Sequence, residues 1–190
     1  IYDANGFFNS CRVWFMFKVF GHKNAIILDG GYKHWVKKNL PTETKVNYLK
    51  KSNYKASFKK KSLIQKYKLE EITNNQSEKH IIIDARSEGR FLGKEPEPRK
   101  GVRKGNIKNS INIPYTTIFD NEGLLLPLDG LKKIFYVDNN LKEKKVIVTC
   151  GSGITACNIL FALKTLSHKE SFLYDGSWAE WGKIKKVKVI

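Results

Sequence analysis

The chain has 190 residues, of which 41% are hydrophobic and 12% aromatic, which predicts a folded core and excludes a disordered tail. Its 35 basic and 18 acidic side chains give a formal net charge of +17, which favours small anionic substrates. The lysines are spread along the sequence without interleaved aromatic residues, so a nucleic-acid partner is not expected. No apolar run is long enough to span a membrane, and three cysteines fit a reducing intracellular compartment better than a secreted disulfide framework.

An internal repeat opens the chain. Residues 1–35 align without a gap on residues 147–181 when shifted by 146 positions. Identical residues coincide at Cys11 and Cys157, Phe15 and Phe161, Lys18 and Lys164, His22 and His168, Asp29 and Asp175, and Trp35 and Trp181. Each copy predicts a strand, a loop, a helix, a short strand, an Asp-Gly turn and a final helix, which is typical of parallel α/β folds. The first residues, Ile-Tyr-Asp, resemble the end of a strand, so we expect sequence upstream of them.

More elements precede the second copy than the first. Residues 79–84 and 110–113 predict strands, residues 129–136 predict a helix, and residues 62–72 predict another helix that ends a lysine-rich connector. The sequence therefore predicts three parts: the C-terminal part of one domain (1–45), a linker with a connecting helix (46–75), and one complete domain (76–190).

The stretch TCGSGITAC contains the most informative cysteine. Cys150 ends an apolar strand, Gly151 and Gly153 follow, and a helix is expected to begin at about Thr155. The carboxyl ends of parallel strands border the usual ligand crevice, and glycine loops at helix N-termini present backbone N–H groups to anions. Such a position favours the thiolate form of cysteine, so Cys150 is a candidate nucleophile.

The three cysteines also allow other interpretations. Cys150 could be a small apolar core residue, which the glycine loop disfavours. Cys11 and Cys157 are expected to be packing residues, with a redox role for Cys157 as the lesser alternative. The residue six positions after Cys150 is Ala156, where a tyrosine phosphatase needs arginine, and the loop lacks the lysine of a nucleotide P-loop. The spacing of Cys150 and Cys157 suits neither a thioredoxin-like pair nor a zinc site, so no metal or cofactor is expected.

The chain resembles the two-domain rhodanese and mercaptopyruvate sulfurtransferase family over nearly its whole length. The resemblance rests on RVWFMFKVFGH (12–22), LDGGYKHW (28–35), DARSEGRFLGKEPEPR (84–99), INIPY (111–115), CGSGITAC (150–157) and YDGSWAEW (174–181). It implies a rhodanese-like parallel sheet flanked by helices, in tandem domains of which the first is incomplete and catalytically silent. Ala4 takes the place of Cys150 in the first copy.

The resemblance also implies an activity: transfer of sulfur from 3-mercaptopyruvate through a persulfide on Cys150, with release of pyruvate, to a thiol acceptor such as thioredoxin or to cyanide. It implies that Ser152 passes a proton, that Asp84 and Arg86 organise the loop, and that the substrate is bound by Arg90, Arg99, Gly151, Gly153, Ile154 and Thr155. A His and an Asp from the early half of the first domain support the serine in this family. The cytoplasm is the expected compartment, with mitochondria as an alternative.

Two other functions remain open. Thiosulfate sulfurtransferases of the family place basic residues after the cysteine, whereas this loop is neutral from Gly151 to Thr155. A persulfide carrier without its own small-molecule donor would keep Cys150 but would not need Arg90 and Arg99.

Overall fold

A parallel sheet forms the centre of the molecule. The computed structural model describes residues 1–4, 6–46 and 48–183, and its four-stranded sheet has the order β2-β1-β3-β4. The strands are β1 His80–Asp84, β2 Ser110–Asn112, β3 Lys145–Thr149 and β4 Ser171–Leu173, and all neighbouring pairs are parallel. Asp84 pairs with both Thr149 and Asn112, so the carboxyl ends of the three strands meet at one edge.

The sequences of the two central strands explain their position. The β1 and β3 segments, HIIID and KVIVT, are continuous apolar runs, as expected for strands covered on both faces. Ile83, Val146 and Val148 face one core, while Ile82 and Ile147 face another. The predicted α/β class with a parallel sheet flanked by helices is confirmed. The tandem arrangement of domains stays a prediction.

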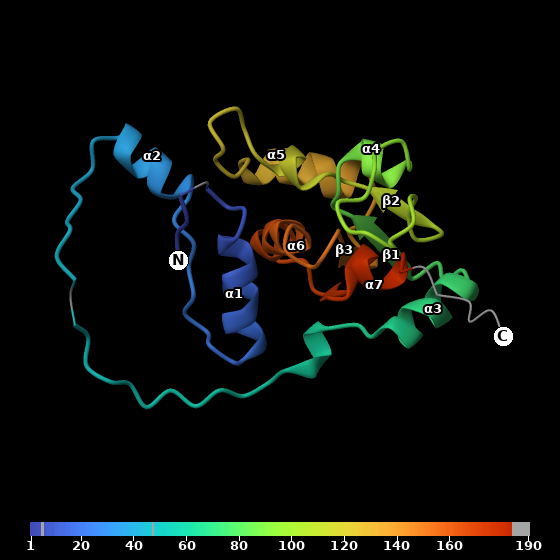
Figure 1. The fold of residues 1–190 in the computed structure, drawn as a ribbon, viewed down its shortest axis with the longest axis horizontal. Helices are drawn as coiled ribbons and strands as arrows, with labels where there is room; N and C mark the ends of the chain where they lie inside the picture. Colours follow the sequence, from blue (N-terminus) through green and yellow to red (C-terminus); the bar gives the residue numbers. More distant parts are fainter. Residues whose placement is uncertain (5, 47, 184–190) are drawn as a thin grey trace.

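Helices cover both faces of this sheet (Figure 1). The helices α5 (Leu128–Lys132) and α6 (Ala156–Thr165) lie on one face, and α3 (Lys66–Asn74) and α7 (Ser177–Trp181) lie on the other. The remaining elements are α1 Ser10–Val19, α2 Gly31–Lys37, α4 Glu88–Phe91, the 3-10 turns η1 Lys60–Ser62 and η2 Tyr115–Ile118, and the π-helical turn η3 Lys133–Val137. The helix expected at 129–136 is thus α5 continued by η3. None of the helices described is both long and apolar enough to cross a membrane.

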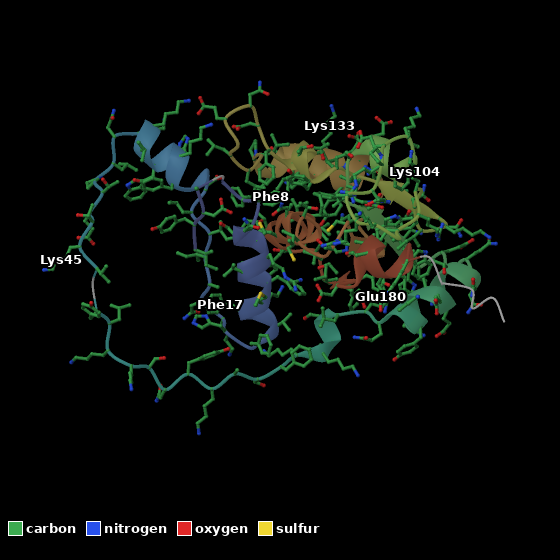
Figure 2. The ribbon with its side chains drawn as sticks, viewed as in Figure 1. Phe8, Phe17, Lys45, Lys104, Lys133 and Glu180 are labelled. Atoms are coloured by element: carbon green, nitrogen blue, oxygen red, sulfur yellow. The ribbon has the colours of Figure 1, made fainter. Side chains whose placement is uncertain are left out.

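The two repeat copies contribute equivalent helices. The helices α1 and α6 begin at Ser10 and Ala156, and α2 and α7 begin at Gly31 and Ser177, each pair being 146 residues apart. The helices α1 and α6 pack together, with the rings of Trp14 and Phe161 edge to face at 5.1 Å. Figure 2 labels Phe17 on α1, where its side chain remains 40% exposed.

The strands expected in the first copy do not form regular strands. Ile1 donates its amino group to the Ile26 carbonyl at 2.7 Å and accepts the Leu28 N–H at 2.8 Å. Asp3 of the first segment also forms an isolated bridge with Gly6, and neither segment extends into a regular ladder among the described residues. The prediction of two strands in this copy is therefore wrong, although the segments do pair.

The connector between the two copies has no regular element over residues 40–46 and 48–59, and it curves around the molecule (Figure 1). It returns to α1 through hydrogen bonds from Ser57 N–H to the Phe20 carbonyl at 2.8 Å and from Lys59 N–H to the Val19 carbonyl at 2.7 Å. The helix expected at 62–72 begins later, at Lys66. The reason is that Leu63 and Ile64 extend the sheet edge beside Leu173, with Ile64 N–H bonded to its carbonyl at 2.9 Å.

Candidate active site

Cys150 directly follows β3 and is only 1% exposed. Its sulfur accepts the backbone N–H of Gly153 at 3.1 Å, because the chain between the two residues curls back. Gly153 has a φ of +78°, and a Cβ there would lie 2.5 Å from Oδ1 of Asp175. Only glycine satisfies both conditions, so this turn explains the Gly-x-Gly spacing of the loop.

Further N–H groups of the loop are free. Among the described residues, the backbone N–H groups of Gly151, Ser152, Ile154 and Thr155 have no hydrogen-bond acceptor. Thr155 is the N-cap of α6, whose ten residues add a partial positive charge at this end. Donors that lack a protein partner beside a cysteine sulfur suit the binding of an anion.

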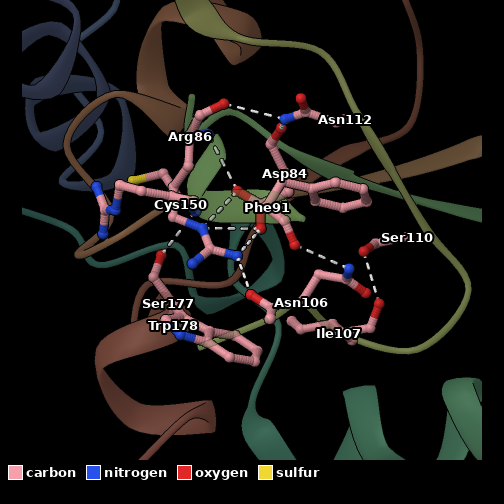
Figure 3. Close-up of polar contacts among 12 residues, drawn as sticks. Asp84, Arg86, Phe91, Asn106, Ile107, Ser110, Asn112, Cys150, Ser177 and Trp178 are labelled. Atoms are coloured by element: carbon pink, nitrogen blue, oxygen red, sulfur yellow. Dashed lines mark hydrogen bonds and ion pairs between the residues drawn. The ribbon is translucent and has the colours of Figure 1, made fainter. Parts of the chain in front are cut away.

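The N-terminus of α7 fixes the other side of the cysteine (Figure 3). Cys150 donates its N–H to Oγ of the buried Ser177 at 3.2 Å, and that hydroxyl donates to the Tyr174 carbonyl at 3.0 Å. The N–H groups of Trp178 and Ala179 donate to the carbonyls of Cys150 and Gly151 at 2.9 and 3.0 Å. Sequence reasoning assigned no role to Ser177, whose φ of +50° gives no signal in the sequence.

The two arginines expected to bind substrate both reach the loop at Gly151. Arg99 donates Nη1 to the Gly151 carbonyl at 3.3 Å. A Cβ on Gly151 would lie 3.0 Å from Nη2 of Arg90, so the guanidinium packs directly on the glycine. The buried Nε of Arg90 has no hydrogen-bond partner among the described residues, while its Nη2 donates to Glu97 at 2.6 Å.

Arg90 is held by an ion-pair network that includes the buried pair of Arg86 and Asp84, which Figure 3 labels. Arg86 donates Nε to both Asp84 oxygens at 3.0 Å and Nη2 to Oδ2 at 2.6 Å. Its Nη1 reaches Glu97 at 2.7 Å, and its guanidinium lies 4.7 Å from the ring centroid of Trp178. Glu97 thus joins Arg86 to Arg90, since each guanidinium donates to a different oxygen of its carboxylate. These contacts match the loop-organising role expected for Asp84 and Arg86, but the sequence did not single out Glu97.

Residues 1–46 also contact the loop, through Arg12 of α1. Its Nη1 lies 2.5 Å from Oδ1 of Asp175 and 3.4 Å from the Gly153 carbonyl. Burial lowers the pKa of Arg12, but the hydrogen bond and charge of Asp175 more than offset this effect and the pKa is raised overall. Because Asp175 also crowds Gly153, this ion pair buttresses the turn below the cysteine sulfur. Sequence reasoning assigned no role to Arg12. Its equivalent in the second copy is Asn158, so the repeat gave no signal for an arginine at this position.

The other two cysteines, Cys11 and Cys157, differ from Cys150 in that no glycine loop follows them, and both are buried. Cys157 is buried, its thiol donates to the Gly153 carbonyl at 3.2 Å, and burial raises its pKa to about 12. Burial likewise raises the pKa of Cys11. Ser152 is half-buried and makes no hydrogen bond with the described residues. No group of His, Cys, Asp and Glu side chains suited to hold a metal ion occurs in the part of the chain that the structure describes.

The parallel sheet and the cysteine loop at its carboxyl edge place the chain among α/β proteins with a candidate nucleophilic cysteine. Comparison with known proteins identifies the family. The family model described as the Rhodanese-like domain matches residues 68–184, more than half of the chain. The chain therefore belongs to the rhodanese-like family, and the resemblance noted in the sequence is confirmed.

Curated relatives share most of this chain. It is 37% identical over 184 residues to the 3-mercaptopyruvate sulfurtransferase of Mus musculus and 34% identical over 184 residues to the thiosulfate sulfurtransferase of Rattus norvegicus. Each comparison covers 95% of this chain and 61% of the relative, so the chain spans about three fifths of the length of these proteins.

Solved structures agree with this assignment. The crystal structure of SseA from Escherichia coli, described as a 3-mercaptopyruvate sulfotransferase with the rhodanese fold, matches with a TM-score of 0.79 at 33% identity, covering 93% of this chain and 65% of that one. The sub-stoichiometric sulfur transferase subunit of yeast mitochondrial complex I matches with a TM-score of 0.85 at 28% identity. The match covers 100% of this chain and 69% of that one.

Proposed function

We propose that the chain is a sulfurtransferase that moves the sulfur of 3-mercaptopyruvate onto Cys150 and then to a thiol acceptor such as thioredoxin, or to cyanide. The observation that carries this proposal is the Gly153 N–H, 3.1 Å from the Cys150 sulfur, in a loop that Arg90 and Arg99 flank. The site can thus stabilise a sulfur anion and meet a substrate carboxylate in the same place.

The chemistry follows from these groups. The Cys150 thiolate attacks the sulfur of 3-mercaptopyruvate, so that an S–S bond forms and the C–S bond breaks. The electron pair of the broken bond passes to the enolate of pyruvate, which takes up a proton to give pyruvate. The Ser152 hydroxyl relays that proton.

Binding is divided between side chains and backbone. Arg90 and Arg99 bind the carboxylate and carbonyl oxygens of the substrate, because guanidinium groups form paired hydrogen bonds with planar oxygen pairs. The N–H groups of Gly151, Gly153, Ile154 and Thr155 stabilise the thiolate and the persulfide.

Thiosulfate is the alternative donor, since thiosulfate sulfurtransferases are among the relatives at 34% identity. It is a dianion without a carboxylate, and the loop from Gly151 to Thr155 offers it no basic side chain. A carrier module that receives persulfide from another protein is a second alternative.

The test is the intact mass of the protein after incubation with 3-mercaptopyruvate, or separately with thiosulfate, without a thiol acceptor. We expect the gain of one sulfur atom from 3-mercaptopyruvate, reversed by a reductant, absent in Cys150→Ser and kept in the matched control Cys157→Ser. A gain from thiosulfate alone would contradict the proposed donor.

Replacing the arginines separates the enzyme from the carrier. In Arg90→Gln and Arg99→Gln, loading from 3-mercaptopyruvate should fall by roughly ten-fold or more, because each change removes charged hydrogen bonds to the substrate. Unchanged loading in both variants would refute their assignment to substrate binding.

We further propose that residues 1–45 are the C-terminal part of a silent rhodanese-like domain, residues 46–75 its linker, and residues 76–190 the catalytic domain; residues 184–190 lie outside the described residues. The equal spacing of the α1/α6 and α2/α7 starts supports this division. An intracellular location, cytoplasmic or mitochondrial, is likewise a proposal. One relative, 35% identical, is the mitochondrial thiosulfate/3-mercaptopyruvate sulfurtransferase 1 of Arabidopsis thaliana.

A further inference from the structure

A basic cavity lies between the C-terminal ends of α1 and α6, at the other end of α1 from the residues that meet the Cys150 loop. It has a volume of about 420 Å³, and among the described residues no carboxylate lines it. Four lysines and a histidine line it together with two aromatic rings and small residues: Trp14, Lys18, Gly21, His22, Lys23, Ala25, Lys59, Phe161, Lys164 and Thr165. A hollow of this size falls in the range of small-molecule sites.

The repeat explains why positive charge converges here. Lys18 and Lys164 occupy the same position in the two copies, in the last turns of α1 and α6, and the packing of these helices brings them to one cavity. Lys59 is added by the connector, which is fixed to the end of α1 by its N–H bond to the Val19 carbonyl at 2.7 Å. The cavity is therefore lined by three separate segments of the chain.

The charges in this cavity are not balanced by the protein. Lysines near helix C-termini offset the partial negative charge of each helix, but that charge is only about half a unit per helix. Lys18, Lys23, Lys59 and Lys164 form no ion pair within the described residues. Burial and the positive charge of Lys164 lower the pKa of Lys18, as expected where like charges lack a counterion.

The cavity also has an aromatic wall. Trp14 and Phe161 meet edge to face at 5.1 Å, and the Lys18 ammonium lies 5.0 Å from the Trp14 ring centroid. His22 is held beside this wall by ring contacts with Phe17 and Tyr54 at 5.2 and 5.4 Å. Cationic groups around an aromatic surface suit a ligand that is anionic at one end and aromatic at the other.

We propose that this cavity binds a small polyanion with phosphate-type groups and an aromatic ring, of the class of nucleoside polyphosphates. The phosphate groups contact Lys18, Lys59 and Lys164, and the ring packs against Phe161 and the edge of Trp14. This site does not depend on the proposed sulfur transfer, because it shares no residue with the Cys150 loop.

The test is calorimetric titration of the protein with ATP and with inorganic tripolyphosphate at low and at moderate salt. We expect saturable 1:1 binding, tighter for ATP than for tripolyphosphate, because only ATP fills the aromatic part. The variant Lys18→Gln/Lys164→Gln should weaken ATP binding by about ten-fold or more, since it removes two charge-assisted contacts. Lys164→Gln alone, at an exposed position, should weaken it less and cannot disturb the packing of Lys18 on Trp14.

The matched control is Lys133→Gln/Lys142→Gln, which removes the same charge from exposed positions elsewhere; Lys133 lies on the opposite side of the molecule from Phe17 (Figure 2). This control should bind ATP within about two-fold of the unmodified protein. Equal weakening in both double variants would mean attraction by net charge alone and would overturn the site. Absent binding, or equal affinity for ATP and tripolyphosphate, would overturn the ligand class.

Discussion

The Glu97 carboxylate is 5% exposed and accepts hydrogen bonds from two guanidinium groups, Nη1 of Arg86 at 2.7 Å and Nη2 of Arg90 at 2.6 Å. Arg86 is itself fixed by Asp84 and by the Gly105 carbonyl at 2.7 Å. Arg90 has no comparable second anchor, since its Nε lacks a partner among the described residues. The orientation of Arg90 over Gly151 therefore depends on Glu97.

Glu97→Gln tests this dependence. The amide keeps the shape of the carboxylate but leaves Arg90 without a counter-charge and Arg86 with Asp84 alone. We therefore expect a loss of about 3 kcal/mol in the free energy of unfolding. Loading of sulfur from 3-mercaptopyruvate should also slow by roughly ten-fold, because Arg90 loses its anchor. Urea unfolding and the rate of persulfide formation measure the two effects.

The matched control is Glu95→Gln, two residues away, where an exposed carboxylate accepts, among the described residues, only the Ser87 hydroxyl at 2.8 Å. It should change neither quantity appreciably. If Glu97→Gln behaved like Glu95→Gln, the positioning role of Glu97 would be wrong.

The three cysteines should differ in reactivity. Burial raises the pKa of Cys157 to about 12 and also raises that of Cys11, so both remain neutral thiols between about pH 7 and about pH 9. In folded Cys150→Ser protein we therefore expect no alkylation by iodoacetamide over this range, and complete alkylation of both thiols after unfolding. Intact mass measures the number of modified thiols, and modification of folded Cys150→Ser at about pH 7 would contradict the expectation.

At the scale of elements, α7 holds the Cys150 loop through its first turn. The Ser177 hydroxyl is buried and is the acceptor of the Cys150 N–H at 3.2 Å. The next two N–H groups, of Trp178 and Ala179, complete the attachment to the carbonyls of Cys150 and Gly151. The position of the cysteine is therefore determined by α7 as much as by the loop that contains it.

Ser177→Ala removes the acceptor and leaves the buried Cys150 N–H unpaired. We expect a loss of about 1–3 kcal/mol in the free energy of unfolding and slower persulfide formation. Ser177→Gly lacks the hydroxyl too but accommodates the φ of +50°, so it should be less destabilised than Ser177→Ala while loading sulfur as slowly.

Thr165→Ala is the control, since within the described part of the chain that exposed hydroxyl bonds only to the Phe161 carbonyl of its own helix, at 3.1 Å. Should Ser177→Ala and Ser177→Gly both load sulfur as fast as Thr165→Ala, the hydrogen bond to Cys150 would have no part in positioning the loop.

The elements that the sequence predicts well are those with a strong local signal. The structure of β1 and β3 is predicted by their apolar runs, and the turn before α6 is predicted by its Gly-x-Gly sequence. The start of α3 was misplaced because Leu63 and Ile64 pair with the distant Leu173, which no local pattern records. Glu97 and Ser177 were missed for the same reason, since their importance comes from partners brought near by folding.

At the scale of the molecule, α1 contacts the Cys150 loop as well as α6. The Arg12–Asp175 ion pair links α1 to the residue that crowds Gly153, whose N–H meets the Cys150 sulfur. We therefore expect a change in how α1 packs to affect the cysteine through Arg12, Asp175 and Gly153. Ala4 of the first repeat copy aligns with Cys150, and Arg12 of that copy contacts the Cys150 loop of the second.

A double-mutant cycle of Arg12→Gln and Asp175→Asn measures this link. Both side chains are partly exposed, at 27% and 49%, so the coupling free energy should be modest, about 0.5–1 kcal/mol. Each single variant should nevertheless slow persulfide formation by several-fold, and the double variant should be no slower than the singles, because all three lack the same buttress.

The matched cycle uses Lys37→Gln and Glu122→Gln, an ion pair at 2.7 Å that joins the end of α2 to the segment before α5 and does not include the Cys150 loop. Its coupling free energy should be similar or smaller, and its variants should form the persulfide at the unmodified rate. Slower loading in both cycles would mean that general packing of the N-terminal segment on the rest of the chain matters, whereas slower loading in the Arg12–Asp175 cycle alone would place the effect at Gly153. The coupling free energies of the two ion pairs are expected to be comparable. The difference in loading rate is therefore the quantity that tests whether α1 supports the cysteine loop.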